Sequence, residues 1–192
     1  MKRNAFLKSV AAFGAVAALP INTIARGLSK LRVTAGFMVA NGKSRAEKPI
    51  TLMEGDTFFS KISTADTNGD LYVYESTRST EGGPAHHYHF DQDEWWYVLQ
   101  GEFLIRIGDV TYQAKPGDSV FGPRMVPHSF AKIGEGEGRL LQIFQPAGKM
   151  EEFFTKVSQG IAKNMTEEEQ DKFREAHEFK RVGPAIKNFK KM

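Results

Sequence analysis

The middle of the chain consists of short runs rich in β-branched and aromatic residues, and turn residues separate these runs. Runs of this length, bounded by Gly, Pro, Asn and Asp, are typical of strands joined by tight turns. They lie at residues 50–53, 57–62, 71–75, 94–100, 103–107, 110–114, 119–121, 128–133 and 140–145. Together with an extended segment around residues 87–89, they make roughly ten short strands, which predicts an all-β sandwich or barrel.

The period of the apolar residues becomes helical after Pro146. Apolar side chains recur at helical spacing at Met150, Phe153, Phe154, Val157 and Ile161. Thr166 and Glu169 then form a capping box, which predicts the start of a second helix. We expect the two helices to pack on the outside of the barrel or against a partner chain, which would make a homodimer. His177 lies among charged residues, and we expect it to be solvated.

The first 25 residues have the pattern of an export signal. Lys2, Arg3 and Lys8 accompany an apolar run at residues 10–19, which is too short to span a membrane. The segment resembles a twin-arginine signal in which Asn4 replaces one arginine, so this route and the ordinary secretory route both fit. We expect cleavage after Ala25 and a bacterial periplasmic location, and a short amphipathic N-terminal helix is the alternative.

Removal of this segment would leave a neutral chain. The sequence has 26 basic and 23 acidic residues; three basic residues and no acidic ones precede Ala25, so 23 of each sign remain. This balance gives no indication of a nucleic acid or of an anionic membrane surface as a partner. We also expect no membrane span in the mature chain. The absence of cysteine excludes disulfides, thiolate metal ligands and a cysteine nucleophile.

Three histidines and one glutamate are candidates for a metal site. His87 and His89 are two residues apart, and alternate side chains of a strand share one face, about 6 to 7 Å apart. Residues 91–93 have turn chemistry, which allows Glu94 to face the two histidines across a hairpin. His128 follows a second turn and is the fourth candidate. Strand alternation turns His86 away from the pair, so we expect it to lie outside the site.

At these residues the chain resembles the cupin superfamily. His87, His89, Glu94 and Gly101 fit the spacing of the first cupin motif. The second motif is matched at Gly117, Pro123 and His128. Two positions depart from the motifs: the opening glycine, Gly82, is one residue closer to the first histidine than usual, and Met125 replaces a motif glycine.

The resemblance implies a single cupin jelly-roll barrel, a double-stranded β-helix, with a C-terminal helical extension. The expected divisions are an export signal at 1–25, an N-terminal arm with at most one strand at 26–48, the barrel at 49–148, and helices and a tail at 149–192. The C-terminal region is also similar to that of quercetin dioxygenase-like cupins, which have a Glu-Phe stretch before Gly-Pro. Here these pairs are Glu178-Phe179 and Gly183-Pro184.

This resemblance implies a metal-dependent dioxygenase that cleaves a flavonol such as quercetin, or a related enol, with dioxygen. Imidazole nitrogen and one carboxylate suit a single divalent transition metal, and Fe, Mn, Co, Ni, Cu and Zn all fit such a ligand set. In quercetinase-like cupins the glutamate is thought both to ligate the metal and to accept the proton of the enol. Glu94 would take that role here, and a role as ligand alone is the alternative. An enolate donates electrons to dioxygen more readily than the neutral enol does, so a positioned base would assist.

By default, we expect the aromatic residues of this region to lie in the core. They are Phe90, Trp95, Trp96, Tyr97, Phe121 and Phe130. By strand alternation, Trp96 and Val98 share the face of Glu94, and Phe130 shares that of His128. We therefore predict that Trp96, Val98 and Phe130 line an apolar pocket over the metal, which would favour a planar, hydrophobic substrate.

Two other functions remain open. A metal-dependent isomerase, epimerase or decarboxylase of a small polar substrate would need basic groups inside the barrel, and Arg106, Arg124 and Lys132 are candidates. A non-catalytic cupin would bind a small ligand without metal dependence. Fold class alone does not decide between these functions.

Overall fold

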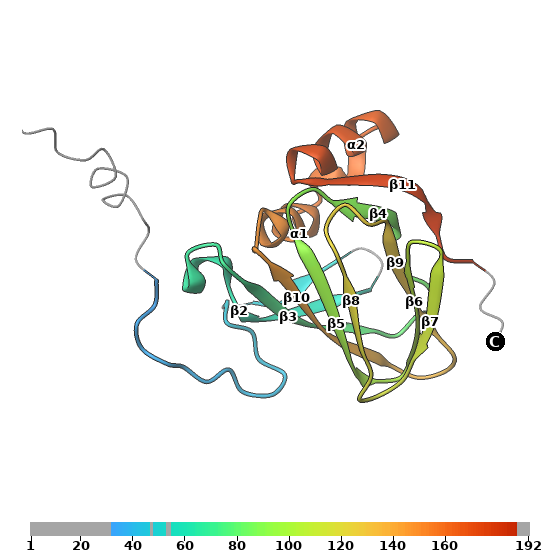
Figure 1. Ribbon diagram of the computed structural model, residues 1–192. Helices are drawn as coiled ribbons and strands as arrows, with labels where there is room; N and C mark the ends of the chain where they lie inside the picture. Colours follow the sequence, from blue (N-terminus) through green and yellow to red (C-terminus); the bar gives the residue numbers. More distant parts are fainter. Residues whose placement is uncertain (1–31, 47, 53–54, 188–192) are drawn as a thin grey trace, which may run out of the picture. The chain divides into compact units, whose positions relative to one another are not determined.

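The computed structural model of the chain describes residues 32–46, 48–52 and 55–187 (Figure 1). The predicted export signal, residues 1–25, lies outside the described residues. Residues 32–46 of the N-terminal arm contain no strand. None of the described helices combines the length and the apolar character needed to cross a membrane.

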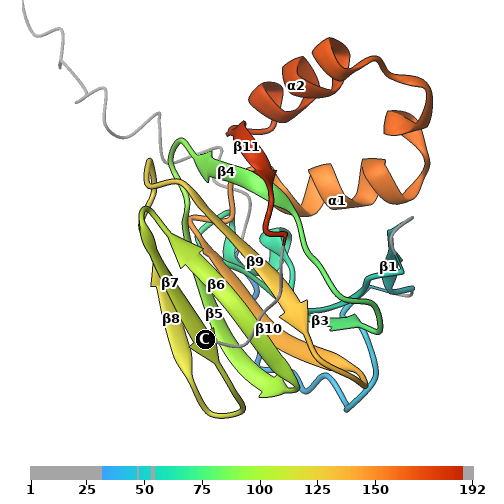
Figure 2. The ribbon, with the colours of Figure 1, turned by 90° about the vertical axis from the view of Figure 1, so that its right-hand side faces the viewer.

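The described strands form two antiparallel sheets. One has the order β1-β2-β3-β10-β5-β8, and the other has the order β11-β4-β9-β6-β7 (Figure 2). Their bounds are β1 Ile50–Thr51, β2 Thr57–Ile62, β3 Tyr72–Arg78, β4 Ala85–His89, β5 Asp93–Gln100, β6 Glu102–Ile107, β7 Val110–Ala114, β8 Ser119–Gly122, β9 His128–Ile133, β10 Gly138–Gln145 and β11 Phe179–Ala185. The prediction of an all-β jelly roll with C-terminal helices is confirmed.

Two clusters of buried apolar side chains fill the space between the sheets. One consists of Phe58, Tyr72, Tyr74, Phe144, Ala147, Met150 and Phe179. The other consists of Trp96, Val98, Phe103, Ile105, Ala114, Phe130 and Leu140, and it joins β5 and β10 of one sheet to β6, β7 and β9 of the other. Burial of apolar surface on this scale is the main favourable contribution to folding.

Strand β5 shows how alternation sorts its side chains between the two faces. Glu94, Trp96 and Val98 are buried, whereas Trp95 and Tyr97 are partly exposed. The parity predicted from the sequence is therefore confirmed for this strand.

The expectation that Phe121 belongs to the core is wrong, since its side chain is 57% exposed. It stands opposite Trp95 in the pairing of β5 with β8, on the outer face of the six-stranded sheet.

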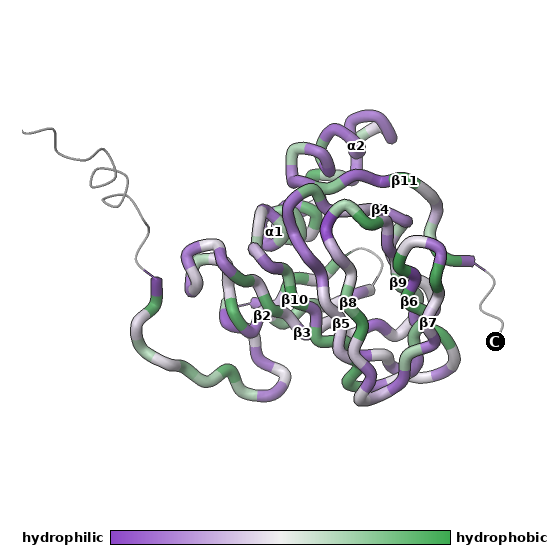
Figure 3. Tube along the Cα trace, in the orientation of Figure 1, coloured by the Kyte–Doolittle hydropathy of each residue, from purple (hydrophilic) through white to green (hydrophobic). Residues whose placement is uncertain are grey.

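The helices follow the barrel in sequence, as expected. α1 spans Met150–Ser158 and α2 spans Glu167–Ala176, with short 3₁₀ turns η3 at Thr64–Thr67 and η4 at Ile161–Asn164. The predicted capping box is present, because Thr166 accepts from the backbone of Glu169 and Glu169 accepts from that of Thr166. Figure 3 shows that α2 is largely hydrophilic, and none of its residues is buried.

The C-terminal region differs from the expected helices and tail in two respects. Residues Phe179–Ala185 form strand β11, which pairs with β4 at the edge of the five-stranded sheet. His177 is 4% exposed rather than solvated. Its ring packs between Phe173 and Phe153, at centroid distances of 4.3 and 5.6 Å, because α2 folds back over α1.

Candidate metal centre

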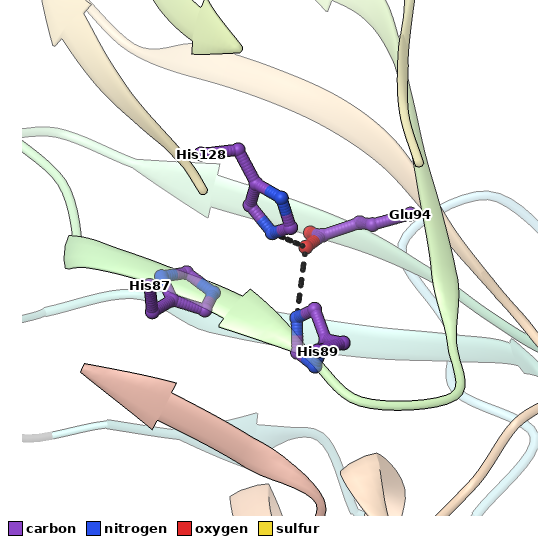
Figure 4. A group of neighbouring side chains, drawn as sticks. All are labelled: His87, His89, Glu94 and His128. Carbon is purple, nitrogen blue, oxygen red and sulfur yellow. Dashed lines mark hydrogen bonds and ion pairs between the residues drawn. The ribbon is translucent and has the colours of Figure 1, made fainter. Parts of the chain in front are cut away.

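Three strands from the two sheets bring the candidate ligands together. β4 carries His87 and His89, and a short turn then leads to Glu94 near the start of β5. His128 is the first residue of β9 and stands directly opposite His87 in the sheet. Figure 4 shows the four side chains pointing toward a common centre.

The four side chains form a compact set of potential ligands. One ligand atom from each of His87, His89, Glu94 and His128 lies within 4.8 Å of the others. Oε2 of Glu94 is 3.2 Å from Nε2 of His89 and 3.1 Å from Nε2 of His128. His87 is partly exposed, whereas the other three are buried. His86 is not a member of this group, and its Nδ1 lies 3.1 Å from Oγ of Ser129, as strand alternation predicted.

Backbone carbonyls determine which nitrogen of two histidines faces the centre. Nδ1 of His87 lies 2.7 Å from the carbonyl oxygen of Ala85, and Nδ1 of His128 lies 3.0 Å from that of Val126. A carbonyl can only accept, so each Nδ1 carries a proton, and a neutral ring in this tautomer has its lone pair on Nε2. This arrangement is typical of metal-binding histidines, in which the outer nitrogen donates to a carbonyl or carboxylate.

The buried polar atoms fit a cation at this centre. Nε2 of His128 is buried without a hydrogen-bond partner, although Oε2 of Glu94 is only 3.1 Å away. In the neutral tautomer this nitrogen and the carboxylate oxygen would both be acceptors, and a positive ion between them would satisfy both. Three imidazole nitrogens and one carboxylate are ligands that divalent transition metals accept.

The protonation states also suit a metal ligand set. Burial, together with the nearby His128 and His89, holds the pKa of His87 well below its ordinary value. Burial likewise lowers the pKa of His89, although Glu94 opposes this effect. Burial alone would raise the pKa of Glu94, but His128 and His89 lower it to about 2. At neutral pH the site therefore offers neutral imidazoles at His87 and His89 beside an ionised carboxylate.

Aromatic side chains enclose the centre. Trp96 packs edge-on against His128 at a centroid distance of 5.3 Å, as its predicted position on the face of Glu94 suggests. Val98 and Phe130 belong to the same buried cluster as Trp96, and their role in lining a substrate pocket stays a prediction.

Two aromatic neighbours of the ligands were not foreseen. Phe144 lies 5.1 Å from the ring of His89, and Phe179 lies 5.5 Å from the rings of both His87 and His89. Alternation along residues 140–145 places Phe144 on the same face as Leu140, so the sequence could have predicted that Phe144 points into the barrel. Phe179 needed the pairing of β11 with β4, which no local pattern signals.

Two of the basic residues considered for a polar interior are placed elsewhere. Arg106 is exposed and donates to the carbonyl of Gly108, and Arg124 is exposed and pairs with Asp93 at 2.7 Å. Lys132 is buried, at 1% exposure, and donates to the carbonyl of Gly134. The suggestion that Arg106 and Arg124 point into the barrel is wrong.

The backbone at Met125 explains why the cupin motif has a glycine at this position. Met125 has a φ of 63°, the left-handed conformation that glycine adopts without strain. Its side chain is 58% exposed, and its backbone N–H donates to the carbonyl of His89 at 2.8 Å. The motif glycine therefore corresponds to a backbone requirement of the ligand-bearing turn.

Comparison with known proteins agrees with this geometry. The family model of the cupin domain matches residues 74–144, which include all four candidate ligands. This segment of the chain is a cupin domain. An uncharacterised protein of Methanocaldococcus jannaschii is 31% identical over 48 residues, which are 25% of this cupin and 38% of that protein. This cupin thus matches well under half the length of that relative.

Three solved structures share the fold. KdgF from a Halomonas species has a TM-score of 0.51 and 20% identity, and the match covers 58% of this chain and 94% of that one. An RmlC-like cupin from Shewanella frigidimarina has a TM-score of 0.50 and 21% identity, with 64% and 99% covered. A predicted oxalate decarboxylase from Thermotoga maritima has a TM-score of 0.50 and 17% identity, with 57% and 99% covered. At these identities the likeness shows the fold alone.

Proposed function

We propose that this cupin is a metal-dependent dioxygenase that cleaves a flavonol or a related enol. His87, His89, Glu94 and His128 would hold one divalent transition metal, drawn from Fe, Mn, Co, Ni, Cu and Zn. The observation that carries the proposal is the convergence of four ligand atoms within 4.8 Å of one another, with the ring of Trp96 packed against His128. The expected partners are a small-molecule substrate and dioxygen.

The metal would act as a Lewis acid that raises the acidity of the enol and brings it together with dioxygen. Glu94 is buried and its low pKa makes it a weak base, so transfer of the enol proton to Oε1 or Oε2 would depend on a bound metal that lowers the pKa of the enol. The aromatic side chains around the centre would exclude water and provide flat apolar surface for a planar substrate.

Lys132 is the one candidate basic residue that is buried, and it donates to the carbonyl of Gly134; this is the support that remains for the competing isomerase, epimerase or decarboxylase. It would need basic groups close to the ligands, but Arg106 and Arg124 are exposed and hydrogen-bonded at the surface. An enol substrate makes no such demand.

The test begins with elemental analysis of the protein purified from its native compartment. About one transition metal per chain is expected, and His128→Ala should lose it. Chain reconstituted with each candidate metal is then given quercetin or another flavonol, and dioxygen uptake and incorporation of ¹⁸O into the product are measured. Uptake that depends on the metal and is lost in His128→Ala supports the proposal. Conversion of the native substrate without dioxygen would overturn the dioxygenase assignment, and ligand binding that His128→Ala leaves unchanged would favour a non-catalytic binding protein.

We further propose that residues 1–25 direct export to the periplasm. The support comes from the basic residues at the beginning of this segment and from the short apolar run that follows them. The segment lies outside the described residues. Cell fractionation and the mass of the purified chain test this directly. A chain that begins at Arg26 in the periplasmic fraction is expected, and an uncleaved cytoplasmic chain would contradict it.

A further inference from the structure

Strand β11 lies outside the residues that match the cupin domain, yet it borders the strand that carries two of the candidate ligands. β4 pairs with β9 at a single position, where His87 faces His128. It pairs with β11 at five positions, in a register that places Phe179 opposite His89 and Arg181 opposite His87. β11 therefore supplies most of the pairing that holds β4 in place (Figure 2).

The side chain of Phe179 fills the space beside both imidazoles. It is 6% exposed, and its ring centroid lies 5.5 Å from that of His87 and 5.5 Å from that of His89. Phe153 of α1 packs against Phe179 at 4.8 Å, nearly perpendicular to it. Phe179 thus packs between helix α1 and strand β4, which carries His87 and His89. Close packing of this kind restricts the rotation of neighbouring side chains.

His89 depends on such packing more than the other two histidines do. Nδ1 of His87 and Nδ1 of His128 are each held by a backbone carbonyl. Nδ1 of His89 is buried without a hydrogen-bond partner. The aromatic rings of Phe144 and Phe179, at 5.1 and 5.5 Å, are therefore the contacts that orient this imidazole from the side away from the centre.

Ion pairs connect β11 to helix α2. Arg181 contacts Asp171 at 2.9 Å and Glu167 at 3.0 Å, and its Nε also donates to Asp171. The neighbouring Lys180 is turned to the other face and pairs with Glu175 at 3.2 Å. Arg181 therefore contacts α2 near the start and in the middle of the helix. It also lies opposite His87 in the pairing of β11 with β4.

We propose that the C-terminal extension is part of the metal site, with Phe179 as a positioning residue for His87 and His89 and Arg181 as the anchor that keeps β11 against β4. This proposal rests on the proposed metal centre and extends it. A metal site needs its ligands oriented before the ion arrives, and loss of an orienting neighbour typically weakens metal binding about 10- to 100-fold.

The test compares Phe179→Ala with Phe58→Ala, using Co²⁺ as the probe. Phe58 is 4% exposed and belongs to the same buried cluster, and its aromatic contacts are to Tyr74 and Phe154 rather than to a ligand. Co²⁺ affinity is measured against a competing chelator, together with the visible absorption of the bound ion and the unfolding midpoint of the metal-free chain. Phe179→Ala should weaken affinity about 10- to 100-fold and shift the absorption bands, whereas Phe58→Ala should lower the midpoint and leave both unchanged. Equal affinity and spectra in the two variants would overturn the proposal.

A second pair of variants avoids any change to the core. Arg181→Gln should weaken Co²⁺ binding about two- to five-fold and speed amide exchange in β4 and β11, since exposed ion pairs contribute modestly. Lys172→Gln, which removes an exposed ion pair within α2 and no contact to β11, should change neither quantity. An Arg181→Gln chain that matches the wild type in both quantities would show that the contact between Arg181 and α2 has no role at the site. A wild-type chain that takes up no Co²⁺ would instead overturn the metal centre itself.

Discussion

Nε2 of His128 lies only 3.1 Å from Oε2 of Glu94, and Glu94 is the one carboxylate among the four candidate ligands, so the binding of a cation should depend on its negative charge. Glu94→Gln keeps the size of the side chain and removes the charge. We expect it to weaken the binding of any divalent metal by at least about 10-fold, because a neutral amide oxygen is a poorer ligand than a carboxylate. Competition with a chelator measures the affinity. Asp91→Asn, an exposed change in the turn before Glu94, is the matched control. A Glu94→Gln chain that binds as tightly as Asp91→Asn would contradict this prediction.

Met125 gives a second residue-scale prediction. A left-handed conformation costs a non-glycine residue about 1 to 2 kcal/mol, whereas glycine loses about 0.5 to 1 kcal/mol more in backbone entropy on folding. Met125→Gly should therefore raise the free energy of unfolding by roughly 0.5 kcal/mol and leave metal affinity unchanged. Chemical denaturation measures the free energy. Lys115 is exposed, lies in a loop and does not have a positive φ, so Lys115→Gly should lower the free energy of unfolding. A change of the same sign in both variants would contradict the conclusion that the left-handed backbone at Met125 is strained.

At the scale of elements, η3 connects the N-terminal arm to the barrel. Asp66 accepts from the backbone of Ser63 and pairs with Arg45 at 2.9 Å. Burial alone would raise the pKa of Asp66, but Ser63 and Arg45 lower it below its ordinary value of 3.8. The unfolded chain therefore binds this proton more readily than the folded chain does, so the stabilisation is present above the unfolded pKa and is lost as pH falls through the lower folded pKa.

Asp66→Asn should remove the dependence of stability on pH that this carboxylate causes. We expect the variant to lose about 1 kcal/mol of unfolding free energy at pH 7, and the difference from wild type to shrink as pH falls below about 4. Denaturation curves at a series of pH values measure it. Asp70→Asn, whose carboxylate is 64% exposed, is the control and should stay close to wild type. A difference from wild type that is constant with pH would exclude the ionised carboxylate as the cause.

The elements differ in how far their sequences predict them. The strands from β2 to β10, the capping box of α2 and the convergence of His87, His89, Glu94 and His128 follow from local alternation, turn residues and motif spacing. β11 does not, because charged residues and Gly183-Pro184 interrupt its pattern and its pairing partner lies about ninety residues earlier in the chain. The burial of His177 and the exposure of Phe121 also depend on tertiary contacts that no window of sequence contains.

At the scale of the whole molecule, the candidate centre connects the two sheets. Glu94 belongs to the six-stranded sheet, whereas His87, His89 and His128 belong to the five-stranded sheet. A metal held by all four would therefore tie the sheets together at one end of their shared core. Because the unfolded chain does not gather these ligands, binding free energy adds to folding free energy.

Metal should consequently raise the global stability of the barrel. At a free concentration about 100 times the dissociation constant, the expected gain in unfolding free energy is about 2.7 kcal/mol. Denaturation of the chain with and without Zn²⁺, followed by addition of a chelator, measures the gain and its reversal. His128→Ala should show no gain, because one of the ligands between the sheets is missing. His86→Ala is the matched control: His86 lies on β4 but faces Ser129, so the variant should keep the full metal-dependent gain. A gain of equal size in His128→Ala would mean that Zn²⁺ stabilises the chain at another position, and the two sheets would then be held together by their apolar clusters without help from the four ligands.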